Sequence, residues 1–242
     1  MRPETIMLDA TLARLPPPWP VDVLPAIREE LRRSRRKVVV LDDDPTGTQT
    51  VHDVAVLTEW SVDALAREFA APNPVFYVLT NSRSLAPAAA DALMREIAAN
   101  LHRAAARVGC SLSVVNRGDS TLRGHFPTEL DALAEALELR AASWLIVPFF
   151  EAGGRLTIGD VHYVAEDGLL VPAGETAFAK DATFGFRSSN LREWVEEKTF
   201  ASIPAASVWS ISLEQLREEG PEAVRRHLAA LPPASVCIVN AA

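Results

Sequence analysis

Short apolar runs alternate with helical patterns along most of the chain. The runs are rich in β-branched residues, as in "KVVVLD" and "PVFYVLT", which is typical of strands. The expected strands are Lys37–Asp42, Asp53–Thr58, Val75–Thr80, Ser111–Asn116, Trp144–Pro148, Ser207–Ile211 and Ser235–Asn240. Continuous apolar strands separated by helices indicate a mostly parallel sheet with helices on both faces. The pattern therefore predicts a three-layer α/β fold.

Two stretches between these strands carry a clear helical period. Pro87–Val108 places Leu93, Ile97 and Leu101 on one face and has its proline in the first turn. Phe126–Leu139 repeats the pattern. A further helix is expected after Asn190, a residue type that caps helix N-termini.

The pattern changes at two places. Between Arg155 and Asp181, glycine-rich turns flank "DVHYV" and "GLLVP", which predict a small β-hairpin inserted on the sheet. Residues 1–36 are proline-rich and then helical, so we expect an N-terminal extension followed by one domain over residues 37–242. The sequence stops at "SVCIVNAA", just past a strand and before any returning helix, at a point where an α/β domain normally continues.

Composition narrows the class of protein. The chain has 242 residues, of which 48% are hydrophobic, enough for a substantial core. A formal charge of −8 argues against a general nucleic-acid binder, which needs a surplus of cations. No run reaches the roughly 18 apolar residues of a membrane span. Cys110 and Cys237 lack metal-ligand spacing and stand in apolar contexts, so reduced thiols and a cytoplasmic location are expected.

Three of the expected strands end in unusually polar loops: "LDDDPTGT", "TNSRS" and "NRGDSTLRGH". In parallel sheets the ligand crevice lies beyond the carboxyl ends of the strands. The consecutive carboxylates Asp42–Asp44 raise one another's pKa unless cations compensate them. Candidate partners are Arg83, Arg117 and Arg123, whose guanidinium groups can also hold a substrate carboxylate.

Other residues near these loops are weaker candidates. The turn Thr46–Thr48 around Gly47 could offer backbone N–H groups to an anion, and Glu151 follows the fifth strand. Each loop taken alone is explained by ordinary turn and cap chemistry. Three such loops at one edge of the sheet favour a binding site.

Two alternatives stay open at this level. The string "DDDPT" fits the D-x-D-x-T motif of haloacid-dehalogenase-like, magnesium-dependent phosphatases, with Asp42 as nucleophile and Asp44 as acid/base. The downstream lysine and late acidic pair of such enzymes are not evident in the sequence. A non-catalytic module that binds acidic sugars is the other alternative.

The motifs together resemble those of the four-carbon acid sugar kinases, formerly a family of unknown function. The resemblance is carried by "DDPTGTQT", "TNSRS", "GDSTLRGHFPTEL" and "VPFFEAGGRLTIGDVHYV", in order, from about Lys37 to the C-terminus. It implies ATP-dependent phosphorylation of the terminal hydroxyl of an acid of the threonate, erythronate or 3-oxo-tetronate type. It also implies that an N-terminal α/β domain holds the acid and that a separate C-terminal domain binds ATP.

The resemblance assigns roles residue by residue. Asp43 and Asp44 correspond to the acidic pair, with catalytic and substrate-binding roles. The other residues that it places in the substrate site are Arg83, Arg117, Asp119, Ser120 and Arg123, with Thr46, Asn81, Ser82 and Glu151 as further candidates. At Arg117-Gly118 many relatives have lysine and an apolar residue, which points to a different substrate preference.

The resemblance also sets expectations for cofactors and partners. ATP and Mg²⁺ are implied for the full-length enzyme, with none bound by this chain alone and no metal ligands in it. The expected partners are a small sugar acid and the ATP-binding domain, in cis or in trans; a homo-oligomer is a further candidate, and no nucleic acid or membrane is expected. Asp43, Arg83, Asp119 and Arg123 are expected to line one cleft, where aspartates accept hydrogen bonds from hydroxyls and arginines hold the acid end.

Overall fold

The computed structural model describes residues 3–47 and 51–242, and three sheets form among them. The chain divides into two compact units. The first unit comprises Met1–Val21, Asp119–Arg123 and Ala141–Ala242, and the second comprises Asp22–Gly118 and Gly124–Arg140. Residues 1–36, expected as one extension, are thus shared between the two units. The expected boundary at residue 37 stays a prediction.

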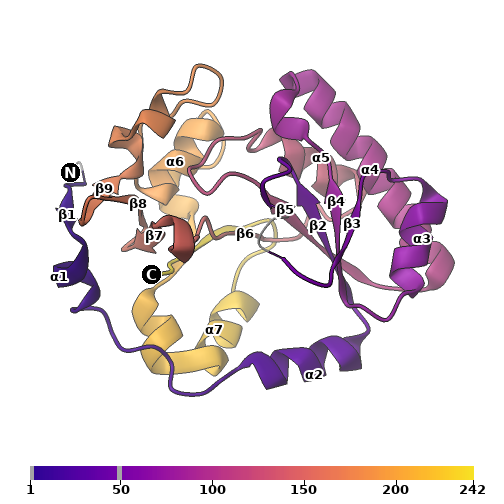
Figure 1. Cartoon of the computed structure of the whole chain (residues 1–242), viewed down its shortest axis with the longest axis horizontal. Coiled ribbons are helices and arrows are strands. Elements are labelled where there is room, and N and C mark those ends of the chain that lie inside the picture. Colours follow the sequence, from indigo (N-terminus) through magenta and orange to yellow (C-terminus); the bar gives the residue numbers. More distant parts are fainter. Residues whose placement is uncertain (1–2, 48–50) are drawn as a thin grey trace. The chain divides into compact units, whose positions relative to one another are not determined.

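The second unit is built on a parallel sheet with the strand order β3-β4-β2-β5 (Figure 1). Its strands are β2 (Lys37–Asp42), β3 (Ala55–Leu57), β4 (Val75–Leu79) and β5 (Leu112–Arg117). Asp42 pairs in register with Leu79 on one side and Arg117 on the other. Three neighbouring strands therefore end at the same level, which brings the polar loops that follow them to one edge.

Three helices of this unit pack together over one hydrophobic core: α3 (Val62–Ala70), α4 (Pro87–Val108) and α5 (Thr128–Ala136). The core residues alternate along the strands, so one face of the sheet meets these helices. Its members include Val39, Leu41, Phe76, Val78, Leu65, Met94, Ile97, Leu101 and Leu133. The long α4 begins with Pro87, whose missing N–H costs nothing in a first turn, and ends before Gly109 at φ 71°.

The opposite edge of the same sheet, where the strands begin, is held by Lys37. Its Nζ donates to the carbonyl oxygens of Ala71 and Asn73, each at 2.5 Å, just beyond the end of α3. Burial lowers the pKa of Lys37. A cavity of about 1070 Å³ opens at this edge, lined by residues that include Arg35, Pro74 and Cys110.

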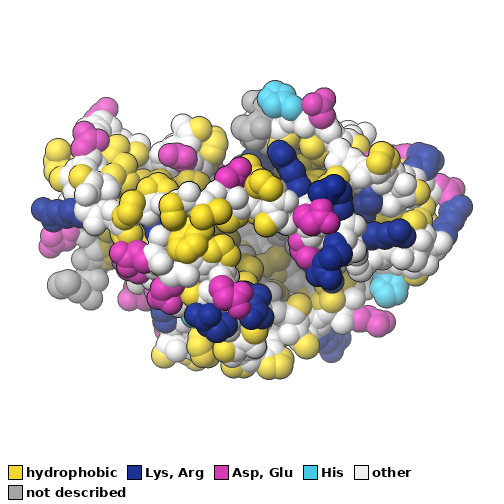
Figure 2. Space-filling view, turned by 90° about the horizontal axis from the view of Figure 1, so that it is seen from below, with side chains coloured by type: hydrophobic (Ala, Val, Ile, Leu, Met, Phe, Trp, Pro, Cys, Tyr) yellow, Lys and Arg dark blue, Asp and Glu magenta, His cyan; other side chains and the backbone are white. Residues whose placement is uncertain are grey.

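Helix α2 (Leu24–Ser34) precedes β2 and has no buried residue. Two of its arginines are paired within the helix, Arg33 with Glu30 at 2.9 Å and Arg32 with Glu29. On the face of the molecule shown in Figure 2, basic and acidic side chains likewise lie next to one another. The positive charges of α2 are therefore largely offset within the helix itself.

The first unit contains one parallel and one antiparallel sheet. The parallel sheet, in the order β10-β11-β6, is formed by β6 (Trp144–Ile146), β10 (Trp209–Ile211) and β11 (Val236–Val239). The antiparallel sheet, in the order β1-β9-β8-β7, is formed by β1 (Ile6–Met7), β7 (Arg155–Ile158), β8 (Val161–Glu166) and β9 (Leu169–Pro172). The helices of this unit include α1 (Leu8–Leu12), α6 (Leu191–Lys198) and α7 (Gly220–Ala229).

A polar cluster ties these elements of the first unit together. Asp160, in the turn between β7 and β8, accepts hydrogen bonds from Arg192 Nε at 2.6 Å, from Asn240 Nδ2 at 2.9 Å and from the Ser210 hydroxyl. Although burial opposes the charge, the hydrogen bonds from Ser210, Asn240 and Arg192 lower the pKa of Asp160. This Asp160 cluster (Asp160, Arg192, Ser210 and Asn240) joins the β7–β8 turn to α6, β10 and β11.

The predicted α/β class with mostly parallel strands is confirmed, and β2 and α4 have the predicted bounds. Asn190 also caps α6, because its side chain accepts from the backbone N–H groups of Arg192 and Glu193. Two details differ from the prediction. The parallel strands divide into two sheets, because β6 pairs with β11 and not with β5. The predicted hairpin is β8 and β9, which lie inside a four-stranded sheet with β1 and β7.

Two further observations concern the class of protein. Among the residues in the described ranges, no helix has both the length and the hydropathy that crossing a membrane requires. Both cysteines are free thiols, and burial raises the pKa of Cys237 to about 11.

Candidate acid-binding site

The backbone of the second unit joins the three predicted polar loops at the carboxyl ends of its strands. The Asp43 N–H donates to the Arg117 carbonyl at 3.2 Å, and the Arg83 N–H donates to the Asp43 carbonyl at 3.3 Å. Asp43 thus connects the end of β5 with the 3₁₀ helix Ser82–Ser84 that follows β4. Strand register and these two hydrogen bonds bring Asp43, Arg83 and Arg117 to one edge of the sheet.

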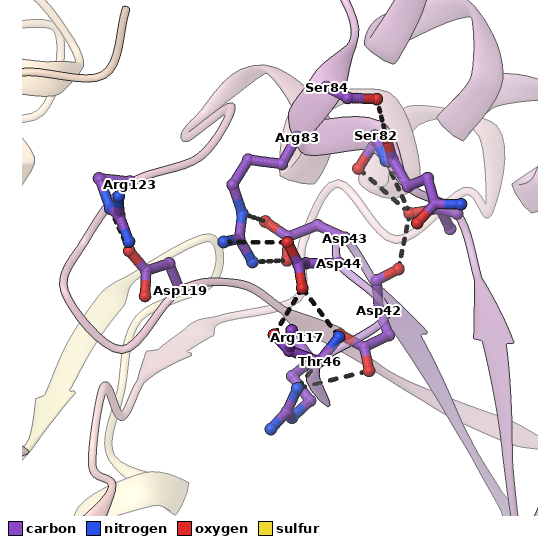
Figure 3. A network of polar contacts seen from close by, with 12 residues as sticks. Asp42, Asp43, Asp44, Thr46, Ser82, Arg83, Ser84, Arg117, Asp119 and Arg123 are labelled. Carbon is purple, nitrogen blue, oxygen red and sulfur yellow. Dashed lines mark hydrogen bonds and ion pairs between the residues drawn. The ribbon is translucent and has the colours of Figure 1, made fainter. Parts of the chain in front are cut away.

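Arg83 and Asp43 form a bidentate ion pair at this edge (Figure 3). Arg83 Nε lies 3.0 Å from Asp43 Oδ2, and Nη2 lies 2.6 Å from Oδ1. Nη1 of the same guanidinium lies 3.5 Å from Asp44 Oδ2. The Asp43 side chain is 4% exposed, whereas Asp44 is 30% exposed. One arginine therefore offsets two adjacent carboxylates and leaves Asp44 accessible.

Asp42 is buried beneath a second arginine. Arg117 Nη1 lies 3.2 Å from Asp42 Oδ1, and the Asp42 side chain is 1% exposed. Burial raises the pKa of Asp42, and Arg117 partly offsets that rise. A Cβ placed on Gly47 would lie 1.5 Å from Arg117 Nη1 and 2.3 Å from Asp42 Oδ2, so a larger residue at this position would require Arg117 or Asp42 to shift. A carboxylate so enclosed is poorly placed to attack a phosphate ester, which disfavours the phosphatase alternative.

Thr46 orders the turn after the carboxylates. Its N–H donates to Asp44 Oδ1 at 2.8 Å, and its hydroxyl donates to the same oxygen at 2.5 Å. These two hydrogen bonds fix one oxygen of Asp44, which indicates that Thr46 has a structural role in the turn. Thr48, predicted in the same turn, lies outside the described residues.

Ser82 and Asn81, predicted as further candidates, differ in exposure. Ser82 is buried; its hydroxyl lies 3.1 Å from Thr80 Oγ1, and its carbonyl contacts His125 Nε2 at 3.1 Å. Asn81 is exposed and adopts a left-handed conformation at φ 53°. Ser82 thus belongs to a buried polar network, and Asn81 is the candidate of this pair that a ligand can reach.

The remaining candidates of the substrate loop, Asp119–Arg123, belong to the first unit. Arg123 Nε lies 2.5 Å from Asp119 Oδ2 and 3.2 Å from Thr121 Oγ1, and the Thr121 hydroxyl also donates to Asp119. Burial alone would raise the pKa of Asp119, but the hydrogen bonds from Thr121 and Arg123 lower it. The guanidinium carbon of Arg123 lies 5.1 Å from the centre of the Phe178 ring, within cation–π range.

Ser120 and Glu151 complete the predicted set. The Ser120 carbonyl lies 2.7 Å from His162 Nε2, whereas Glu151 is exposed and its carboxylate has no hydrogen bond to a described residue. The sequence did not single out Thr121, Phe178 or His162. The one sequence feature that could have indicated His162 is its position as a histidine within the apolar strand "DVHYV".

The structure therefore brings Asp43, Asp44, Arg83 and Arg117 together in the second unit. It pairs Asp119 with Arg123 in the first unit. That both sets line one cleft stays a prediction, since each unit is described by itself. In the part of the chain that the structure describes, no three His, Cys, Asp or Glu side chains gather as metal ligands would.

Comparison with known proteins identifies the family to which this chain belongs. Residues 38–242 match the family model for a sugar-binding N-terminal domain, so the chain belongs to that family. Its structural neighbours carry the domain once of unknown function, DUF1537, that defines the four-carbon acid sugar kinases, and the resemblance found in the sequence is confirmed. No curated protein matches the chain.

Among solved structures, a protein of Bordetella bronchiseptica is 25% identical with a TM-score of 0.61; the match covers 85% of this chain and 48% of that one. It is described as a domain-swapped dimer with bound citrate. Haemophilus influenzae protein HI1011 is 17% identical, with a TM-score of 0.60 over 84% of this chain and 48% of that chain. A putative tRNA synthase of Salmonella typhimurium is 18% identical, with a TM-score of 0.57; the match covers 85% of this chain and 47% of that chain. The chain spans about half the length of these structures.

Proposed function

We propose that this chain is the substrate-binding part of an ATP-dependent kinase that phosphorylates the terminal hydroxyl of a four-carbon sugar acid. The observation that carries the proposal is the Arg83–Asp43–Asp44 arrangement at the carboxyl ends of β2 and β4. It occurs in a chain whose family binds sugars. Threonate, erythronate and 3-oxo-tetronate are the candidate acids.

The chemistry of the side chains fits a polyhydroxy acid. Ionised carboxylates accept hydrogen bonds from hydroxyl groups, and Asp44 is the more exposed of its pair. Arginine recognises the acid end by donating N–H groups to carboxylate oxygens. Arg117 Nη2 and Arg123 Nη2 have no hydrogen-bond partner among the described residues, so both guanidinium groups have donors to offer.

The Bordetella relative supports an acidic ligand. Citrate is a hydroxylated polycarboxylate, and it is bound in that structure. It presents the same two kinds of group as a sugar acid, hydroxyl and carboxylate. We therefore expect this chain to prefer hydroxy acids over neutral polyols.

The proposed division of labour leaves ATP and Mg²⁺ to a separate domain. Phosphoryl transfer depends mainly on positioning and on neutralising the charge of the γ-phosphate. The part proposed for this chain is to bind the acid and orient its terminal hydroxyl, with Asp43 and Asp44 as candidate catalytic residues. A kinase of this kind would act in the cytoplasm, where ATP is available, and a homo-oligomer is proposed from the domain-swapped dimer of the Bordetella protein.

Titration calorimetry of the purified chain with threonate, erythronate and citrate tests the proposal, with the neutral polyol threitol as the ligand control. We expect binding of at least one four-carbon acid and none of threitol. Arg117→Ala should weaken that binding about tenfold or more, as for the loss of a charge-assisted hydrogen bond. Arg95→Ala is the matched control, because Arg95 pairs with Asp91 and Glu135, from α4 and α5.

Kinase function is then separated from a non-catalytic binding module by adding an ATP-binding domain from a relative. Phosphorylation of the bound acid would support the kinase. Acid binding that never yields phosphorylated product with any such domain would favour the binding module. Absence of binding to every acid tested would contradict the proposal as a whole.

A further inference from the structure

His162 occupies a fully buried position in β8 and uses both ring nitrogens. Its side chain is 0% exposed, Nδ1 lies 3.0 Å from Thr157 Oγ1, and Nε2 lies 2.7 Å from the Ser120 carbonyl. A carbonyl only accepts, so Nε2 carries the proton and Nδ1 accepts from the Thr157 hydroxyl. The ring is therefore held in one neutral tautomer, and the direction of its Nε2–H is fixed.

The partners of His162 are themselves rigidly placed. Thr157 stands directly opposite His162 in the β7–β8 ladder and is also 0% exposed. The backbone N–H of His162 donates to the Ser189 carbonyl at 2.8 Å, and that of Thr157 donates to the Ala241 carbonyl at 2.8 Å. The imidazole is thus held in a fixed orientation by the antiparallel sheet, with its Nε2–H directed at the Ser120 carbonyl.

The loop that receives this hydrogen bond needs support from outside. Within it, the Leu122 N–H donates to the Asp119 carbonyl at 2.9 Å. Leu122 has φ 68°, a left-handed conformation that costs a non-glycine residue about 1 kcal/mol. A strained backbone persists only where neighbouring structure holds it. The bond to Ser120 O reaches the loop next to Asp119, whose carboxylate orients Arg123.

We propose that His162 is a positioning residue that fixes the backbone of the Asp119–Arg123 loop and thereby presents Asp119 and Arg123 to the acid. The role in ligand binding rests on the proposed function, under which Asp119 and Arg123 contact the substrate. His162 itself touches no substrate in this account. Its effect passes through the Ser120 carbonyl.

Two substitutions separate the hydrogen bond from the packing. His162→Gln keeps a side-chain N–H that can reach the Ser120 carbonyl, whereas His162→Leu fills similar space without a donor. Leu170→Ala is the control for general loss of stability, since Leu170 is 0% exposed in the core of the same antiparallel sheet. All three are made in the complete chain.

The first measurement needs no ligand. Hydrogen exchange of the amides of residues 121–123 is followed by mass spectrometry at a pH where all variants are folded. We expect exchange about tenfold faster in His162→Leu and close to wild type in His162→Gln and Leu170→Ala. Unchanged exchange in His162→Leu, or an equal rise in Leu170→Ala, would overturn the inference.

The second measurement is the affinity for whichever four-carbon acid binds the wild-type chain. We expect His162→Leu to weaken it about tenfold and His162→Gln to keep it within about twofold. In a double-mutant cycle, the losses of His162→Leu and Arg123→Ala should be less than additive, because part of the effect of His162 passes through Arg123. Fully additive losses would contradict the positioning role. If no acid binds the wild-type chain, the proposed function fails, and the exchange measurement alone decides whether His162 fixes the loop.

Discussion

Arg83 holds both oxygens of Asp43, with Nε 3.0 Å from Oδ2 and Nη2 2.6 Å from Oδ1. Two parallel hydrogen bonds fix the plane of the carboxylate as well as its position. Asp43 is buried and Arg83 is only 22% exposed, so the pair fixes the orientation of both side chains at the sheet edge. A single hydrogen bond would leave the two groups free to rotate. Removing the arginine would leave a buried carboxylate without its main counter-charge.

Arg83→Ala should weaken binding of a four-carbon acid far more than Arg35→Ala. Arg83 neutralises Asp43 and Asp44 where the acid is expected to bind, whereas Arg35 follows α2 at the other edge of the sheet. The expected loss for Arg83 is on the order of 1.5–3 kcal/mol in calorimetry. Equal small losses for both variants would remove Arg83 from the site.

Gly47→Ala should destabilise the second unit and displace Arg117. The added Cβ would overlap Arg117 Nη1 and the Asp42 carboxylate, so one of these groups must shift, which weakens the pairing of a buried carboxylate. We expect a loss of about 2 kcal/mol in chemical unfolding. Gly118→Ala is the control, because its Cβ would meet Asp43 Oδ2 at 3.7 Å, an ordinary contact. Equal stability of both variants would show that the chain has room over Asp42.

Stability should fall as the pH is lowered through the range from about 6.5 to about 4, and His162 should be one cause. The pKa of His162 is lowered to about 4, mainly by burial and also by Arg155, although the carbonyls of Ser120 and Leu156 and the charge of Asp119 act in the opposite direction. Between the two pKa values the unfolded chain binds a proton that the folded chain excludes. Protonation therefore favours unfolding, by up to roughly 3 kcal/mol at the low end.

Urea unfolding at a series of pH values from 7 to 4 measures this loss. His162→Gln has no imidazole to protonate, so its free energy of unfolding should change less over the same range. A slope as steep as that of the wild type would mean that other groups cause the loss.

The chain of 242 residues should not phosphorylate threonate or erythronate at an enzymatic rate when given ATP and Mg²⁺. Its sequence has neither a G-x-G-x-x-G nor a G-x-x-x-x-G-K-[ST] phosphate loop. Without a held donor the reaction stays bimolecular and loses the advantage of proximity. A coupled ADP-release assay checks this, and turnover in the range of 1–100 per second typical of kinases would show that the assignment of ATP binding to another domain is wrong.

Much of the fold was predictable because the strands of the second unit are continuous apolar runs. The bounds of β2 follow from "KVVVLD", and those of α4 from a proline start and a glycine end. In contrast, β1 has two residues and pairs with β9 from more than half the chain away, so no local period marks it. The division of the parallel strands into two sheets depends on which strand lies beside β6, which local pattern does not encode.

The candidate site was predictable in its residue types and less so in its pairings. Strand ends place aspartates and arginines at one edge, but register sets Arg117 beside Asp42, and the 3₁₀ helix after β4 brings Arg83 to Asp43. Exposure separates Asp44 from its buried neighbours, and sequence does not give exposure. The role of His162 was missed because its partner Ser120 lies 42 positions earlier in the chain. Its complete burial, which fixes the ring, is also not visible in the sequence.

The Asp160 cluster has a consequence for how the first unit comes apart. One carboxylate accepts hydrogen bonds from α6, β10 and the residue that follows β11, and its own backbone belongs to the β7–β8 turn. Opening the turn would remove three hydrogen-bond donors from a carboxylate whose pKa is low, and freeing β11 would remove the donor of Asn240. The antiparallel and parallel sheets of the unit are therefore coupled, because local unfolding of either sheet also costs hydrogen bonds to Asp160 that stabilise the other.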